Sequence, residues 1–132
     1  MKFIIYTDGG ARGNPGPAGI GIVIKADGKT VKEYGEYIGK ATNNQAEYKA
    51  LISALETVKN LGATEVEIFM DSELIVKQIK GEYKVKHPGL APLFLKVYNL
   101  RAGFKKFFVR HIPREKNKEA DKLVNEAIDK RI

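Results

Sequence analysis

The sequence predicts a single-domain α/β protein built around a mixed five-stranded sheet with helices on its faces. Three observations support this fold class: the chain has 132 residues, its predicted elements follow the order βββαβααβα, and no linker, repeat or low-complexity tract divides it. One domain over residues 1–132 is therefore expected. The first three strands should form an antiparallel meander, whereas the last two each follow a helix and should pair in parallel.

The predicted strands of the meander lie at residues 2–8, 18–28 and 30–39. The first, KFIIYTD, is rich in Ile and aromatic residues, which predicts a strand buried on both faces. The second ends at the turn signal Asp27-Gly28. The third alternates polar and apolar residues more regularly, so we expect it to be less buried.

The pattern changes to helical spacing at residues 42–62, where apolar side chains recur every three or four positions. Thr42 or Asn43 can cap the start of this helix, and Gly62 ends it. Residues 65–71 then predict a fourth strand that ends on an acid.

The second half of the chain continues the alternation of helices and strands. Ser72 is placed to cap a short helix over residues 72–83. The remaining predicted elements are a helix at about residues 90–100, a strand at 105–112 and a helix at 117–131.

Composition narrows the class of function. The chain has no cysteine, which excludes disulfides, Cys-based zinc sites and a Cys nucleophile. Its 23 Lys and Arg residues against 16 Asp and Glu residues give a net charge of +7, which favours a polyanionic partner such as nucleic acid, although many basic proteins are merely soluble. No apolar run reaches the ~20 residues that span a bilayer, so no membrane partner is expected. The N-terminal run stops at Asp8, too early for a signal peptide, which predicts a cytoplasmic protein.

Four acidic residues occupy positions where a carboxylate is unusual. Asp8 ends the first predicted strand and Asp71 ends the fourth. If these strands are parallel neighbours, both carboxylates emerge at the edge of the sheet where open α/β folds place ligands. Glu47 lies on the apolar stripe of its helix, and Asp121 flanks the apolar side of the last helix, so both should lie near the sheet.

Each acid also has a purely structural interpretation. Asp8 could be a turn residue, Asp71 could cap the following helix, and Glu47 and Asp121 could complement helix N-termini. Convergence of all four is costly, because one pair of unit charges at ~4 Å and an effective dielectric of about 20 costs ~4 kcal/mol. A multivalent cation offsets such repulsion. An all-oxygen ligand set favours Mg²⁺ or Mn²⁺, and two such ions suit phosphoryl displacement on a phosphodiester.

Four segments of the chain are similar to the motif blocks of a known family. In order along nearly the whole chain, it resembles type 1 ribonuclease H in YTDGGARGNPGPAG, TNNQAEYKAL, IFMDSELIVKQI and HIPREKNKEADKLVNEA. The resemblance implies a ribonuclease H-like fold and endonucleolytic cleavage of the RNA strand of an RNA–DNA hybrid. It also implies two metal ions per active site, 5′-phosphate and 3′-hydroxyl products, and little sequence specificity.

The resemblance carries over to individual residues. It implies that Asp8, Glu47, Asp71 and Asp121 are the catalytic metal ligands. His111 stands ten residues before Asp121, as the family's mobile histidine does, which implies a role in proton transfer or product release. Glycines would let the nucleic acid approach the main chain, and amide side chains would bind ribose 2′-hydroxyls. The implied substrate contacts are Gly9, Gly10, Asn14, Thr42, Asn43, Asn44 and Ser72.

Two features depart from the family pattern. The basic, Trp-rich protrusion of some members is missing, so we expect weaker hybrid binding and looser discrimination against double-stranded RNA. Glu73 places an extra negative charge near the predicted metals. Four lysines nearby have two interpretations: they replace part of the positive charge of the missing protrusion, or they form only a solvated face. They are Lys77, Lys80, Lys84 and Lys86.

Two other classes of function share this fold. A non-catalytic module that binds hybrids or duplexes would retain the fold, but the presence of all four acids counts against it. The second class is a DNA-directed nuclease or an integrase-like domain. The pair Asn43 and Asn44 counts against this class, because amide side chains suit the 2′-hydroxyls of ribose. The sequence gives no sign of an obligate protein partner.

Overall fold

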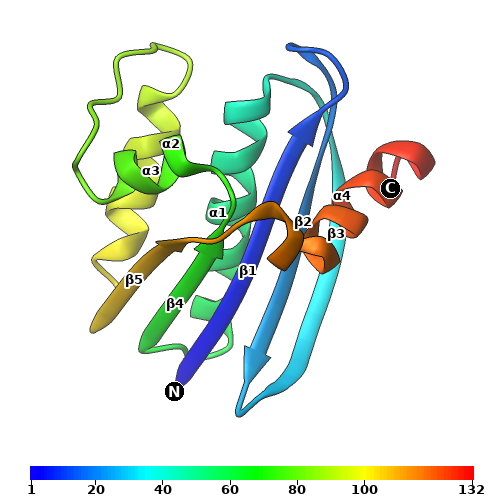
Figure 1. Cartoon of the computed structure of the whole chain (residues 1–132). Helices are drawn as coiled ribbons and strands as arrows, with labels where there is room; N and C mark the ends of the chain where they lie inside the picture. The colour runs from blue at the N-terminus through cyan, green and yellow to red at the C-terminus, as the bar shows by residue number, and fades with distance from the viewer.

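Five strands form one sheet in the computed structural model, which describes residues 1–132. The strands are β1 (Lys2–Ala11), β2 (Gly16–Ala26), β3 (Lys29–Ala41), β4 (Glu65–Met70) and β5 (Lys106–His111). They lie in the order β3-β2-β1-β4-β5 (Figure 1). The pairs β1–β2 and β2–β3 are antiparallel, and the pairs β1–β4 and β4–β5 are parallel. The predicted mixed sheet is confirmed.

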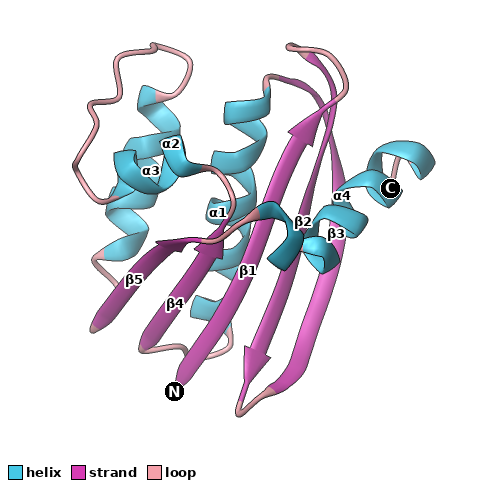
Figure 2. Cartoon of the chain, in the orientation of Figure 1, coloured by secondary structure: helices cyan, strands magenta, loops and turns pink.

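Helices cover both faces of the sheet, as Figure 2 shows. On one face lie α1 (Asn43–Asn60), α2 (Glu73–Ile79) and α3 (Ala91–Arg101), and on the other α4 (Lys118–Lys130) packs over β2 and β3. A short 3-10 turn, Arg114–Lys116, leads from β5 into α4. None of these helices combines the length and the apolar character needed to cross a membrane.

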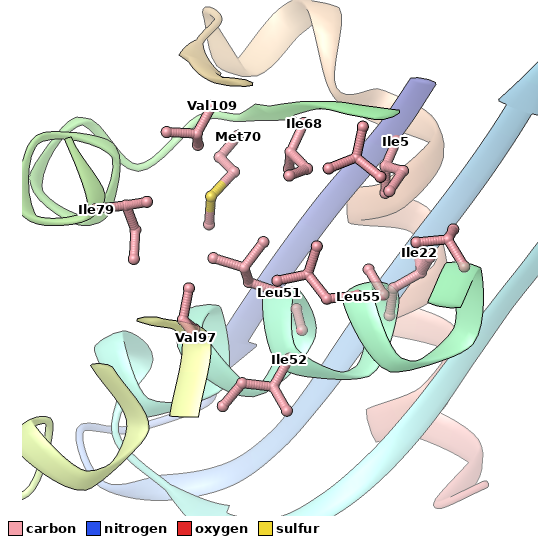
Figure 3. Packing of buried hydrophobic residues seen from close by; sticks show 14 of the residues in the cluster. Ile5, Ile22, Leu51, Ile52, Leu55, Ile68, Met70, Ile79, Val97 and Val109 are labelled. Atoms are coloured by element: carbon pink, nitrogen blue, oxygen red, sulfur yellow. The ribbon is translucent and has the colours of Figure 1, made fainter. Parts of the chain in front are cut away.

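The hydrophobic core lies between α1 and the sheet (Figure 3). Leu51 and Leu55 of α1 pack toward the sheet, and Ile5, Ile22 and Ile68 come from three neighbouring strands. All five side chains are fully buried. Burial of each contributes about 1.5–3 kcal/mol, so this layer holds α1 firmly against the middle of the sheet.

The prediction that β1 is buried on both faces is wrong. Phe3 and Ile5 face the core and are buried, whereas Ile4 and Tyr6 on the opposite side are only half-buried. The reason is that α4 packs mainly over β2 and β3, so the same side of β1 stays partly open. Composition alone does not reveal how far a covering helix extends.

The first strand also runs further than predicted. It continues past Asp8 to Ala11, because its antiparallel pairing with β2 goes on after its parallel pairing with β4 stops at Thr7. Asp8 is therefore the first β1 residue without a partner in β4. This places its carboxylate at the edge of the sheet, although the strand itself does not end there.

Both predicted caps are present. Thr42, rather than Asn43, caps α1: its hydroxyl accepts from the backbone N–H of Gln45 at 3.2 Å, and the Gln45 side chain accepts from the Thr42 N–H at 2.9 Å. Ser72 caps α2 by accepting from the N–H of Ile75 at 3.3 Å. These caps fix the starts of the two helices that flank the acidic edge of the sheet.

The helix predicted over residues 72–83 is shorter in the structure. It ends at Ile79, because Gly81 adopts a left-handed backbone conformation with φ of +82°, which stops the helix. The other predicted helices and strands agree with the structure to within two residues at each end, apart from the C-terminal end of β1.

Candidate active site

Three carboxylates meet where β1 runs past the C-terminal end of β4. Asp8 comes from β1, Asp71 directly follows β4, and Glu47 comes from the second turn of α1. One oxygen atom from each carboxylate lies within 4.8 Å of the others. Asp8 is 7% exposed and Glu47 is 6% exposed, so two of the three charges are almost fully removed from water.

Glu47 reaches this cluster because α1 lies against the backbone of β1 at Gly9. The Gly9 N–H donates a hydrogen bond to Glu47 Oε1 at 2.8 Å. A Cβ atom at Gly9 would overlap the backbone carbonyl group of Ala46, so no other residue fits here without moving the helix. Close packing of α1 against β1 therefore requires a glycine at position 9, which sequence analysis did not identify. This requirement is separate from the predicted role of Gly9 in substrate approach.

A second glycine brings the last helix to the same place from the other face of the sheet. Gly21 in β2 is the register partner of Asp8. A Cβ atom at Gly21 would overlap the carbonyl oxygen of Ala120, so the start of α4 lies directly on the strand. Asp121 follows Ala120 and lines a cavity of about 210 Å³ together with Asp8 and Arg114. The structure thus brings all four predicted acids to one region, with Asp121 outside the tight group of three.

Burial and mutual repulsion make this cluster unfavourable when fully charged. Burial is the largest cause that raises the pKa of Asp8, to about 8, and the negative charges of Asp71 and Asp121 add to it. Burial also raises the pKa of Glu47 well above its usual value, and the charges of Asp8 and Asp71 add to this rise. The positive charge of Arg114 opposes both shifts only in part.

These carboxylates fit a hard divalent cation. The donor atoms are all carboxylate oxygens, which Mg²⁺ and Mn²⁺ prefer, and the chain has no cysteine to favour a softer metal. The raised pKa values of Asp8 and Glu47 mean that burial and repulsion disfavour their ionised forms when no added positive charge compensates them. A bound cation would displace those protons and stabilise the ionised cluster.

The predicted catalytic histidine lies at the same edge of the sheet but outside the cluster. His111 is the last residue of β5, it is exposed, and its register partner is Met70, which precedes Asp71. Glu73, the predicted additional charge, is exposed and forms an ion pair with Lys77 at 2.8 Å. That pairing lowers the pKa of Glu73 and partly neutralises its charge near the site.

Most of the predicted substrate residues gather around the start of α1, whereas Ser72 lies at the start of α2. The side chain of Asn14 accepts from the backbone N–H of Asn43 at 3.0 Å, and Asn43 Oδ1 accepts from the N–H of Ala11 at 2.8 Å. These bonds tie the turn after β1 to the helix. A cavity of about 170 Å³ is lined by Asn14, Thr42, Asn44, His87 and Leu90. His87, which sequence analysis did not single out, therefore lies beside three of the predicted contacts.

Two further residues at the acidic cluster were also missed. Arg114 lines the cavity with Asp8 and Asp121 and supplies the opposing positive charge. Asn117 is buried and donates a hydrogen bond to Asp71. The only sequence signal for Asn117 is that an Asn begins the last predicted helix, which is also typical of an ordinary helix start.

Comparison with known proteins places this geometry in a family. The profile of the family described as reverse transcriptase-like matches residues 6–127. The bifunctional protein Rv2228c of Mycobacterium tuberculosis is 48% identical over 131 residues, which cover 98% of this chain and 36% of that protein. Ribonuclease HI of Halobacterium salinarum is 45% identical over 125 residues, which cover 94% of this chain and 63% of that protein. The chain thus spans between about a third and two thirds of the length of these relatives.

Solved structures narrow the assignment. The type 1 ribonuclease H of Halobacterium salinarum superposes with a TM-score of 0.95 at 44% identity, covering 98% of this chain and 99% of that one. LC11 ribonuclease H, solved in complex with an RNA/DNA hybrid, superposes with a TM-score of 0.92 at 56% identity, covering 97% of both chains. Fold and acidic cluster together define a domain of the ribonuclease H class. The chain belongs to the reverse transcriptase-like family, and within it to type 1 ribonuclease H.

Proposed function

We propose that this chain is a metal-dependent endoribonuclease that hydrolyses the RNA strand of RNA–DNA hybrids and leaves 5′-phosphate and 3′-hydroxyl ends. The observation that carries the proposal is the group formed by Asp8, Glu47 and Asp71, whose oxygen atoms lie within 4.8 Å of one another at the edge of the sheet. The similarity to LC11 ribonuclease H, which was solved with an RNA/DNA hybrid, supports the choice of substrate.

The four acids would hold two Mg²⁺ or Mn²⁺ ions. Metal ions held there would supply the chemistry of an in-line displacement, in which the attacking water is activated and the leaving 3′ oxygen is stabilised. The chain's own contribution is to hold the ligands in place. The Gly9 N–H donates to Glu47 Oε1 at 2.8 Å and so fixes its position. Asp8 and Glu47, whose pKa values are raised, would release their protons when a cation binds. Asp121 would complete the ligand set from α4.

The substrate would lie across the start of α1. Asn43 and Asn44 would bind ribose 2′-hydroxyls and base edges. Thr42 would contact a phosphate of the DNA strand, Asn14 would contact the hybrid near its minor groove, and Gly10 and Ser72 would lie along its path. The net charge of +7 favours binding to phosphates. Contacts of this kind position a duplex without reading its bases, so we expect little sequence specificity.

The test is cleavage of one labelled sequence presented as RNA–DNA, RNA–RNA and DNA–DNA, each with Mg²⁺, Mn²⁺ or EDTA. Cutting of only the RNA strand of the hybrid, abolished by EDTA, would support the proposal. Additional cutting of RNA–RNA would mean that discrimination is looser, as the lack of the basic protrusion in the segment at residues 81–100 leads us to expect. Cutting of DNA–DNA would indicate a DNA-directed nuclease, and binding without cutting would indicate a non-catalytic module.

Replacement of His111 by Ala should slow turnover and leave measurable activity. A side chain that assists proton transfer or product release accelerates a reaction that the metal site can still perform, and we expect a loss of about 10²-fold in kcat. Single-turnover and steady-state rates of the His111→Ala variant would separate the two roles. Complete loss of activity in a folded variant would assign His111 a different, essential role.

Binding of the hybrid should weaken steeply with salt. Each phosphate that the chain neutralises contributes about −0.9 to the slope of log K against log salt concentration. The measurement is the Kd of the hybrid between 50 and about 200 mM salt, in EDTA so that no cleavage occurs. A Kd that does not change with salt would mean that the positive charge of the chain is incidental to its function.

A further inference from the structure

We propose that Asn117 is a positioning residue that holds the Asp71 carboxylate in its metal-binding orientation and ties α4 to β1. This inference deepens the proposed function and rests on it for the identity of the metal site. Asn117 is a polar residue that is only 1% exposed, it lies at the junction between the 3-10 turn and α4, and it belongs to none of the predicted site residues.

The side-chain amide of Asn117 uses both of its N–H groups at the site. Nδ2 donates to the backbone carbonyl of Thr7 at 2.9 Å and to Asp71 Oδ2 at 3.0 Å. The first bond ties Asn117 to the residue before Asp8, and the second ties it to Asp71. One planar group therefore fixes the position of the Asp71 carboxylate relative to the backbone of β1.

The contacts of the Asn117 amide indicate why this residue type is required. Its other polar atom, Oδ1, is buried and has no hydrogen-bond partner in the protein. A buried acceptor without a donor is costly, yet the amide cannot be turned over, because Oδ1 would then face the Thr7 carbonyl and the Asp71 carboxylate. The two Nδ2 bonds thus decide its orientation. Only an amide donates twice from one nitrogen at this length without adding charge.

Asn117 also connects the third element of the site. The backbone carbonyl of Asn117 accepts from the N–H of Asp121 at 3.1 Å, in the first turn of α4. Asn117 therefore contacts both Asp71 and the backbone carbonyl of Thr7 through its side chain, and Asp121 through its own backbone carbonyl. Such a group holds the ligands from β1, β4 and α4 in one arrangement before any cation binds.

Loss of this amide should weaken metal binding. Removing a hydrogen-bond partner of a metal ligand typically costs about 10- to 100-fold in metal affinity. We therefore expect Asn117→Ala to raise the Kd for Mn²⁺ about 10- to 100-fold, measured by calorimetry in the absence of nucleic acid. The matched control is Asn99→Ala, which removes an exposed amide on α3, far from the acids in sequence, and should leave the Kd unchanged.

A second measurement keeps the proposal testable if Asn117→Ala is too unstable to titrate with metal at the assay temperature. In a double-mutant cycle, the unfolding midpoints in urea are compared for Asn117→Ala, Asp71→Ala and the double variant without metal, at a lowered temperature at which each is folded. If Asn117 acts through Asp71, Asn117→Ala should shift the midpoint less when Asp71 is already Ala. Equal shifts in both backgrounds, or an unchanged Mn²⁺ Kd in folded Asn117→Ala, would overturn the proposal.

The proposed function and the role of Asn117 fail in different ways. If the unmodified chain binds Mn²⁺ but cleaves no hybrid, the proposed function is wrong, and a weaker Kd for Mn²⁺ in Asn117→Ala still supports the positioning role. If the unmodified chain binds no divalent metal, the metal site itself is wrong, and the positioning role fails with it.

Discussion

Replacement of Asp8 by Asn should abolish hybrid cleavage and, without metal, make the protein more stable. Asp8 is almost fully buried, and the negative charges of Asp71 and Asp121 both repel its carboxylate. Its ionised form is therefore unfavourable in the folded state unless a cation is bound. The amide has the same shape and removes that charge. Activity should fall to background, because Asp8 is one of the three carboxylates of the tight cluster.

The stabilisation should depend on pH in a defined direction. The pKa of Asp8 is raised from 3.8 in the unfolded chain to about 8 in the folded protein. Stability from the protonated carboxyl group is therefore fully present below about pH 4 and is lost as the pH rises through 8. Glu47 acts in the same direction, since its pKa is also raised. The unmodified chain without metal should become less stable as the pH rises from 4 to 8. The Asp8→Asn variant should lose less stability over the same range.

The measurement is the thermal midpoint in EDTA and in Mg²⁺ across this pH range. At pH 8 in EDTA we expect Asp8→Asn to melt higher by several degrees, which corresponds to about 1–2 kcal/mol. Added Mg²⁺ should stabilise the unmodified chain by mass action and the variant far less. Asp27→Asn makes the same replacement in an exposed turn and should change neither midpoint nor activity. A lower midpoint for Asp8→Asn in EDTA would contradict the account of charge repulsion.

The four acids could be predicted from the sequence because each breaks a local pattern. Glu47 interrupts an apolar helical stripe, and its burial in the structure follows from the same spacing that buries Leu51. Asp8 and Asp71 follow apolar strand residues, and the helix between them predicted the parallel pairing that places them together. Periodicity and connection order are local properties of the chain, so the sheet and this part of the site follow from them.

The residues that set the exact approach of the helices could not be predicted in this way. Gly21 is opposite Asp8 only through the register of β1 and β2, and its close contact is with Ala120, almost a hundred residues away. Asn117 looks like an ordinary cap until its contacts with Thr7 and Asp71 are known. Contacts between distant segments depend on how layers pack, which hydrophobic spacing does not specify.

Replacement of Gly9 by Ala should destabilise the protein severely. The new methyl group would overlap the backbone carbonyl of Ala46, which belongs to a helix and cannot rotate away as a side chain can. Either α1 moves off β1, which loses packing of the central layer, or the Gly9 hydrogen bond to Glu47 breaks. We expect a loss of about 3 kcal/mol or more in the free energy of unfolding, measured by urea denaturation in EDTA.

Replacement of Gly10 by Ala provides the matched comparison and separates packing from substrate binding. A Cβ atom there would lie 3.6 Å from Val124 Cγ1, an ordinary contact, so stability should change by less than about 1 kcal/mol. If Gly10 allows the hybrid to approach the main chain, this variant should instead bind the hybrid more weakly. Equal stability of the two variants would show that α1 adapts to a side chain at Gly9. The position of Glu47 would then depend on its hydrogen bond rather than on the close contact between helix and strand.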